Sequence, residues 1–130
     1  MLRSTSHDAR GLAAAAALAL LAATAAGCSR PTLQLDESQS FRDATRTQTV
    51  EAYVPEGTEE LELAIELAVD RGTVAFRVSD PLGVVQWQGE LTSGGNFSDQ
   101  RGLDPVVGTW RLDFEMVGAS GRYEARWMGR

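Results

Sequence analysis

Few side chains in this 130-residue sequence can carry out nucleophilic or acid–base chemistry. The chain has one histidine, His7, and one cysteine, Cys28, and both lie near the N-terminus. Beyond Cys28 there is neither histidine nor lysine. This composition excludes histidine-based catalytic triads, zinc sites of histidine and cysteine, Schiff-base lysines and an internal disulfide framework. The reactive group that remains is the thiol of Cys28.

The segment before Cys28 has the features of an export signal. Arg3 and Arg10 precede a 15-residue apolar stretch from Leu12 to Ala26, as in the charged and apolar regions of secretory signals. A helix of that length reaches about 22 Å, which is short of the roughly 30 Å hydrocarbon core of a bilayer. We therefore expect residues 1–27 to be a helical signal peptide rather than a permanent membrane span.

The sequence Ala25-Ala26-Gly27-Cys28 resembles the lipobox of bacterial lipoproteins, although Ala25 stands where leucine is usual. The resemblance implies a diacylglyceryl group on the Cys28 thiol, cleavage just before this residue and usually acylation of the new amine. Because serine and not aspartate follows Cys28, the family's sorting rules imply the outer membrane in a cell with two membranes. The alternative is ordinary secretion, with cleavage after Ala25 or Ala26 and an unmodified Cys28.

The part of the chain after the signal is acidic. The chain has 12 basic and 18 acidic side chains; because Arg3, Arg10 and Asp8 precede Cys28, residues 28–130 carry 10 and 17. Nucleic-acid binding depends on clustered basic residues, and here the arginines are scattered and outnumbered. We expect no nucleic-acid partner, and any attachment to a membrane would depend on the lipid and not on charge.

Two segments follow the signal. Residues 28–40 are polar, contain Pro31 and lack a sustained period, which predicts a flexible tether. Residues 41–130 alternate apolar and polar side chains in short runs, which predicts one β domain. Within that domain, Glu60–Val69 matches the period of a strand; the alternative is a helix, because Glu, Leu and Ala favour helices and Thr58 suits an N-cap.

Turn-forming residues divide the domain every 8 to 12 residues or so. Asp70-Arg71-Gly72 and Asp80-Pro81-Leu82-Gly83 are predicted turns, and Gly118–Gly121 is predicted to close a hairpin between Thr109–Val117 and Arg122–Trp127. In that hairpin, Asp113 or Glu115 would face Arg126. The pattern favours an antiparallel β-sandwich, jelly-roll or immunoglobulin-like, of about seven or eight strands.

Three segments carry a weak resemblance to known β domains: Gly72–Trp87, Gly108–Leu112 and Gly121–Tyr123. They look like the jelly-roll accessory domains that accompany secreted bacterial peptidases, and like the GOLD domains of cargo-trafficking proteins. Both have a strand ending in Asp-Pro-x-Gly and a late strand that begins Gly-x-Trp or Gly-x-Tyr. The resemblance implies a non-catalytic domain that acts by interaction.

Trp87 is the aromatic residue best suited to ligand contact. It lies between Gln86 and Gln88 and before a glycine-rich loop, so it could stack on a sugar or contact a partner. Packing in the core is the alternative, and it is the expected role of Trp110 and Trp127, which share strand faces with other apolar residues.

Side-chain oxygens gather in one predicted loop region after Leu91, at Asn96, Ser98, Asp99 and Asp104. Oxygen is the ligand that hard cations such as Ca²⁺ prefer, but the spacing matches no calcium loop, and solvated or turn-forming roles are the alternative. We expect no cofactor. The expected protein is a lipid-anchored, non-catalytic β-sandwich of the bacterial envelope that binds an envelope protein or polysaccharide. The alternatives are a carbohydrate-binding module or a small metal-dependent hydrolase.

Overall fold

The computed structural model describes residues 30–130, so the predicted signal and Cys28 lie outside the described residues. These residues form five antiparallel strands: β1 (Leu33–Val54), β2 (Leu61–Ser79), β3 (Val85–Thr92), β4 (Gly95–Leu103) and β5 (Gly108–Gly129). This part of the chain is all-β, as predicted, and it contains no helix with the length and hydrophobicity needed to cross a bilayer.

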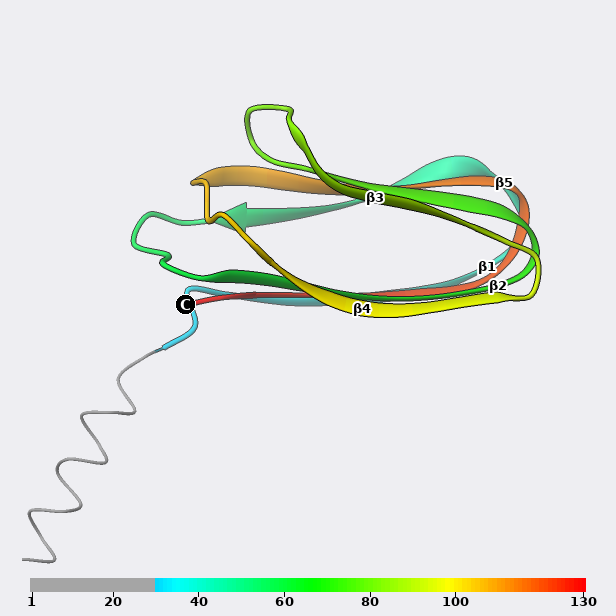
Figure 1. The fold of residues 1–130 in the computed structure, drawn as a ribbon, viewed down its shortest axis with the longest axis horizontal. Coiled ribbons are helices and arrows are strands. Elements are labelled where there is room, and N and C mark those ends of the chain that lie inside the picture. The colour runs from blue at the N-terminus through cyan, green and yellow to red at the C-terminus, as the bar shows by residue number, and fades with distance from the viewer. Residues whose placement is uncertain (1–29) are drawn as a thin grey trace, which may run out of the picture. The chain divides into compact units, whose positions relative to one another are not determined.

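Three of the strands are long enough to serve both layers of a sandwich (Figure 1). β1, β2 and β5 bend where their register shifts, between Phe41 and Arg46 in β1 and between Val69 and Thr73 in β2. At these bends Asp43, Gly72 and Gly118 have positive φ angles of 46°, 77° and 53°. The three strands therefore turn from one layer into the other together.

The two layers have matching strand orders. Layer A contains residues 33–41 of β1, 121–129 of β5, 61–69 of β2, and β4. Layer B contains residues 46–54 of β1, 108–117 of β5, 73–79 of β2, and β3. Two four-stranded layers connected in this way are a jelly roll. Residues 30–130 form five strands and not seven or eight, but three of these strands cross both layers, so the domain has eight strand segments.

The predicted hairpin at Gly118–Gly121 is wrong. β5 runs without interruption through these residues, and Arg122–Trp127 pairs with β1 and β2 in layer A. A Cβ atom on Gly72 would collide with the carbonyl oxygens of Val117 and Gly118, so two glycines allow the strands to touch at the bend. As a result, Arg126 lies beside Asp36 and Glu124, at 4.0 and 3.6 Å, and not opposite Asp113 or Glu115.

The predicted tether over residues 28–40 is also mostly wrong. β1 begins at Leu33, residues 33–40 pair with β5, and residues 31–130 form one compact unit. The Thr32 amide already donates to the Gly129 carbonyl at 2.8 Å. Leu33 and Leu35, which alternate with polar residues, pack against the core. A backbone ladder and two half-buried leucines are sufficient to order a segment whose overall composition is polar.

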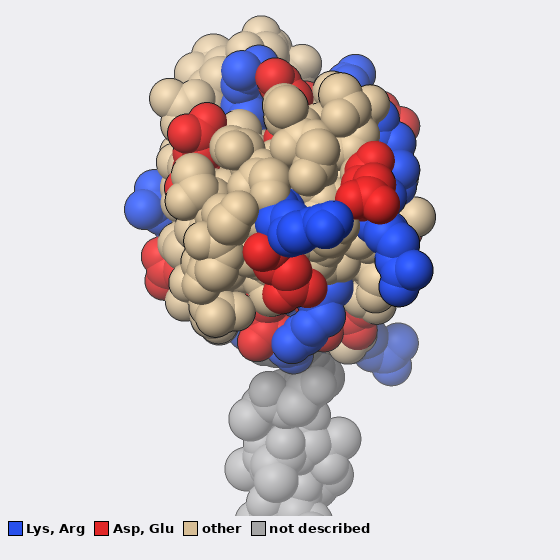
Figure 2. All heavy atoms as spheres, turned by 90° about the vertical axis from the view of Figure 1, so that its right-hand side faces the viewer, with Lys and Arg blue, Asp and Glu red and all other residues tan. Residues whose placement is uncertain are grey.

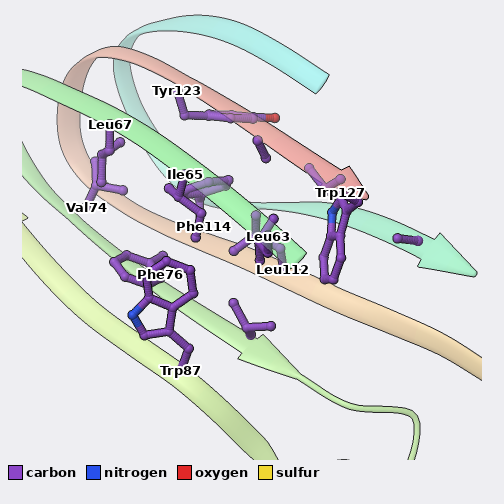
Figure 3. Packing of buried hydrophobic residues seen from close by; sticks show 14 of the residues in the cluster. Leu63, Ile65, Leu67, Val74, Phe76, Trp87, Leu112, Phe114, Tyr123 and Trp127 are labelled. Carbon is purple, nitrogen blue, oxygen red and sulfur yellow. The ribbon is translucent and has the colours of Figure 1, made fainter. Parts of the chain in front are cut away.

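The segment Glu60–Val69 is a strand and not a helix. Leu61, Leu63, Ile65, Leu67 and Val69 are each 2% exposed or less, whereas the alternate residues face away from the core. Trp110 and Trp127 are also core residues, as predicted, and their ring centroids lie 6.1 Å apart. Figure 3 shows side chains of both layers meeting between them, including the Phe114 and Tyr123 rings, which stack at 4.1 Å.

Candidate functional site

Trp87, the aromatic residue predicted to contact a ligand, packs in the core. It is 5% exposed, and its ring meets Phe76 edge to face at 5.4 Å (Figure 3) and Phe97 at 6.1 Å. The guanidinium carbon of Arg101 lies 4.7 Å from the ring centroid. Because aromatic rings and a cation surround it, Trp87 does not present an open face on which a sugar could stack.

The predicted oxygen ligands lie apart from one another. Asn96 lines a shallow hollow on the outer face of layer A, together with Ser98. Asp99 is three residues further along β4, so it points to the opposite side, and its carboxylate accepts the Gln100 amide at 2.8 Å. Asp104 lies beyond the end of β4. Within residues 30–130, no group of three or more His, Cys, Asp or Glu side chains is placed to hold a metal ion.

A polar groove of about 560 Å³ runs across the outer face of layer B. We call it the layer-B groove. It involves all four strands of the layer, and its lining is mostly charged or polar: Thr47, Ala75, Phe76, Arg77, Gln88, Gly89, Glu90, Arg111, Asp113 and Glu115.

The strand register places these side chains in two rows. In one row Thr47 pairs with Glu115, Glu115 with Ala75, and Ala75 with Glu90. In the neighbouring row the sequence is Thr49, Asp113, Arg77 and Gln88. Every second residue of a strand faces the same side, so residues far apart in the chain project side by side.

Small residues form the floor of the groove. Ala75 places only a methyl group in the middle of its row. A Cβ on Gly89 would lie 2.7 Å from the Phe76 ring, so the glycine leaves room for that ring to reach the groove. Bulkier residues at positions 75 and 89 would fill or displace this floor.

Hydrogen bonds hold part of the groove in place. Oδ1 of Asp113 accepts the Thr49 hydroxyl at 2.6 Å and lies 3.4 Å from Nη2 of Arg111. Asp113 thus fixes the Arg111 guanidinium, while Glu90 and Glu115 remain exposed. The groove combines two cations with three carboxylates, so donors and acceptors alternate over a short distance.

Sequence analysis did not identify this groove. Arg77 and Arg111 belong to different strands, and they share a face only because β5 pairs with β2 in this register. The available signal was the outward position of charged residues in alternating strands, such as Arg111, Asp113 and Glu115. That signal predicts a solvent-exposed face of a sheet, but it does not show which strands lie side by side in that sheet.

No protein-family model matches the chain, and no curated protein matches it in sequence. Solved structures do resemble it. The pre-peptidase C-terminal domain of a collagenase from Bacillus anthracis has a TM-score of 0.51 and 14% identity, over 73% of this chain and 89% of that domain. This agreement confirms, for the fold alone, the predicted resemblance to accessory domains of secreted peptidases.

Two further structures share the fold. A protein of Bacillus endospore appendages, described as disulfide-linked pili, has a TM-score of 0.50 and 13% identity, over 78% of this chain and 90% of that one. The Bacillus licheniformis lipase BlEst2, in its propeptide form, has a TM-score of 0.52 and 14% identity over 75% of this chain. The present chain spans only 22% of that lipase. Identities this low indicate a common architecture and no common activity.

Proposed function

We propose that this chain is a lipid-anchored protein of the bacterial envelope whose jelly roll binds a hydroxyl-rich polysaccharide in the layer-B groove, without catalysis. The observation that carries the proposal is the alternation of cationic donors and carboxylate acceptors across the groove. A cell-wall or surface polysaccharide is the ligand class expected where an exported lipoprotein resides.

The groove suits hydroxyl groups because each hydroxyl can donate and accept a hydrogen bond. Arg77 and Arg111 offer planar, multi-donor guanidinium groups, and Glu90, Asp113 and Glu115 offer acceptors. The opposite charges nearly cancel, which favours a neutral ligand over a strongly charged one. Because Asp113 already holds Arg111, part of the ordering cost is met before the ligand arrives.

An exposed aromatic ring lies on the same face of layer B. Tyr53 is 59% exposed and pairs with Thr109, two residues from Arg111 along β5. Aromatic rings with one apolar face and a polar edge are well suited to stacking on sugars. Tyr53 does not line the groove, but it is an exposed ring on the same face and could take the stacking role that sequence analysis considered for Trp87.

The composition of the domain supports binding rather than catalysis. Residues 28–130 contain no histidine and no lysine to serve as a base or nucleophile. Glu90 and Glu115 are exposed, whereas a carboxyl group that acts as a general acid is typically buried in an apolar pocket. Asp113 is engaged by Thr49 and Arg111.

Removing one guanidinium group tests the groove. Arg77→Ala should weaken retention on insoluble cell-wall polysaccharide by about 10- to 100-fold, because hydrogen bonds to a charged group contribute about 1.5–3 kcal/mol. Arg122→Ala, which removes an exposed arginine from layer A, should bind like the wild type. Equal retention of both variants, or no retention of the wild type by any polysaccharide tried, would contradict the proposed ligand.

The anchor requires a separate test. Cells grown with labelled palmitate should incorporate the label into the wild type and not into Cys28→Ser. Recovery of an unlabelled wild type in the soluble fraction would exclude lipid attachment while leaving the groove proposal in place.

A further inference from the structure

The start of the described chain and the loops that join the two layers lie at the same end of the jelly roll. Leu33 and Leu61 both lie opposite Gly129 in layer A, and Val54 lies opposite Gly108 in layer B. The connections 55–60 and 104–107 link these strand ends. In Figure 1 this end, which we call the loop end, lies on the left with the C-terminus.

The loop end carries apolar side chains that are exposed to water. Leu82 is 79% exposed, Val84 53% and Val107 44%. These residues belong to two loops that adjoin, because a Cβ on Gly108 would lie 2.7 Å from Cβ of Pro81. We call these three residues the apolar tip.

Hydrogen bonds hold the first of these loops in a fixed shape. The Asp80 carboxylate accepts the amides of Leu82 and Val84 at 2.9 Å each, and the Gln86 side-chain amide also at 2.9 Å. The Gly83 amide donates to the Asp80 carbonyl, and the Asp80 amide to the Val84 carbonyl, both at 2.9 Å. Leu82 is therefore projected into water by a braced loop, although burying a leucine side chain would stabilise the protein by about 1.5–3 kcal/mol. Three exposed apolar side chains on adjoining loops, one of them braced, are suited to contact with another surface.

The short chain between Cys28 and β1 suggests that the surface in contact with the apolar tip is a membrane. Four residues lie between Cys28 and Leu33, so the Cα atoms of these two residues are five steps apart and no more than about 18 Å from each other even in a fully extended chain. Because β1 begins at the loop end, a lipid on Cys28 would keep the apolar tip close to the membrane. Once the lipid holds the protein at the membrane, the apolar tip is confined close to the same surface. Even a weak contact of the tip can then form, because it no longer depends on a separate encounter.

We propose that the apolar tip inserts into the interface of the membrane that holds the lipidated Cys28. The inference rests on the proposed lipid anchor. On the neighbouring connection Glu56, Glu59 and Glu60 are exposed, and Arg130 lies 3.7 Å from Glu60, so acidic side chains outnumber basic ones there. This excess disfavours an anionic surface, and we expect zwitterionic headgroups beneath the tip.

The opposite end has a different character, which supports this orientation. Arg42, Asp43, Asp70 and Arg71 line a hollow at the bends, and Arg71 lies 3.5 Å from Asp43. Figure 2, which looks onto this end, shows basic and acidic side chains close together across it. Such a surface is suited to water. With the loop end on the membrane, the layer-B groove would face sideways and stay open to a polysaccharide.

The test compares two labelled positions in the full lipidated protein. Leu82→Cys and Val117→Cys each receive an environment-sensitive fluorophore, with the Cys28 thiol blocked by its lipid. Val117 is a matched control, because it is 56% exposed but adjoins Gly118 at the bends. In vesicles of phosphatidylethanolamine and phosphatidylcholine, the label at position 82 should shift to the blue and be quenched by brominated acyl chains at least about twofold more than the label at 117.

Each other outcome overturns the inference. If the protein floats with the vesicles but both labels remain equally in water, the tip does not insert and the anchor stands. If the wild type does not float and its Cys28 reacts with thiol reagents, the anchor itself fails, and the inference fails with it. If the label at 82 shifts without vesicles and the mass doubles in sedimentation, a second copy of the chain covers the tip.

Discussion

The guanidinium group of Arg101 on β4 lies over the indole of Trp87 on β3, 4.7 Å from the ring centroid. β3 and β4 belong to different layers, and each pairs with β2. The contact therefore helps to close the edge of the sandwich where β3 and β4 face each other, next to the Trp87–Phe97 ring contact and the Ser93-Gly94 turn. It also explains why Trp87, beside two glutamines in the sequence, lies in the core.

Replacing this arginine should loosen the edge. We expect Arg101→Gln to lower the free energy of unfolding by about 0.5–1 kcal/mol, because a partly exposed cation–π contact contributes about that much. Urea denaturation followed by tryptophan fluorescence would measure it. Arg122→Gln, at an exposed site on layer A, is the control; a similar loss in both variants would mean that the Trp87 contact has no particular importance.

The ordering of residues 33–40 can be tested through two leucines. Leu33→Ser and Leu35→Ser should each destabilise the domain by about 1 kcal/mol, because both side chains are half-buried against the core. Thermal unfolding would show the loss. Gln34→Ser, an exposed site on the same strand, should have almost no effect. Three indistinguishable melting curves would restore the flexible tether that composition predicts.

The bend between the layers depends on the absence of a side chain at position 72. Gly72→Ala should destabilise the fold by about 3 kcal/mol or more, because the added Cβ meets backbone carbonyls and the φ of 77° is unfavourable for alanine. Gly83→Ala, with a φ of 85° but open space around it, should lose only about 1–2 kcal/mol. Chemical denaturation of both variants separates steric collision from backbone strain, and equal losses would contradict the close approach of β2 to β5.

Asp80 should make stability depend on pH in the acid range. Donation from the Val84 amide, with the Gln86 side chain and the Leu82 and Gly83 amides, holds the pKa of Asp80 below its usual 3.8, against the burial that would raise it. A lowered pKa means that the carboxylate stabilises the fold above the usual value, and that this contribution is lost as the pH falls through the lowered pKa.

Asp80→Asn is the variant that isolates this effect. It places an amide nitrogen against the Gln86 donor, so it should be less stable than the wild type at neutral pH, and the two should converge on acidification. Urea midpoints between about pH 2 and pH 6 would show the convergence. Asp104→Asn, in an exposed loop, should follow the wild type throughout; a constant gap between Asp80→Asn and the wild type would exclude the carboxylate as the titrating group.

Local patterning predicted the strand over Glu60–Val69 and the inward-facing side chains of Thr109–Val117, but not residues 33–40 of β1. The alternation of Leu61, Leu63 and Ile65 with charged residues identified a half-buried strand, although the residue types favour a helix, and all three side chains are buried. The same alternation placed Trp110 and Trp127 in the core. A period of two residues depends only on which side of a strand faces water, so it can be read without knowing the partner strand.

The connections were harder to predict, because a glycine can mark either a turn between two strands or a bend within one continuous strand. The two glycines of Gly118–Gly121 suggested a hairpin, but β5 continues through them, and Gly118, with a φ of 53°, lies at a bend shared with Gly72. Which of the two roles Gly118 has depends on the neighbouring strand β2, whose Gly72 lies some 45 residues earlier in the chain. The same difficulty hid the order of residues 33–40, whose ladder partner is the C-terminal segment of β5.

The sequence by itself determined the β class and the alternating core, because each depends on neighbouring residues, and it predicts an export signal before Cys28. Only the tertiary structure decided that Trp87 is covered by Arg101, that Arg77 and Arg111 share a groove, and that the loops carrying Leu82 and Val107 adjoin at the loop end. The physical reason is register. A side chain's neighbours across a sheet are set by pairing between distant strands, and a shift of one residue would turn each of these side chains to the other face.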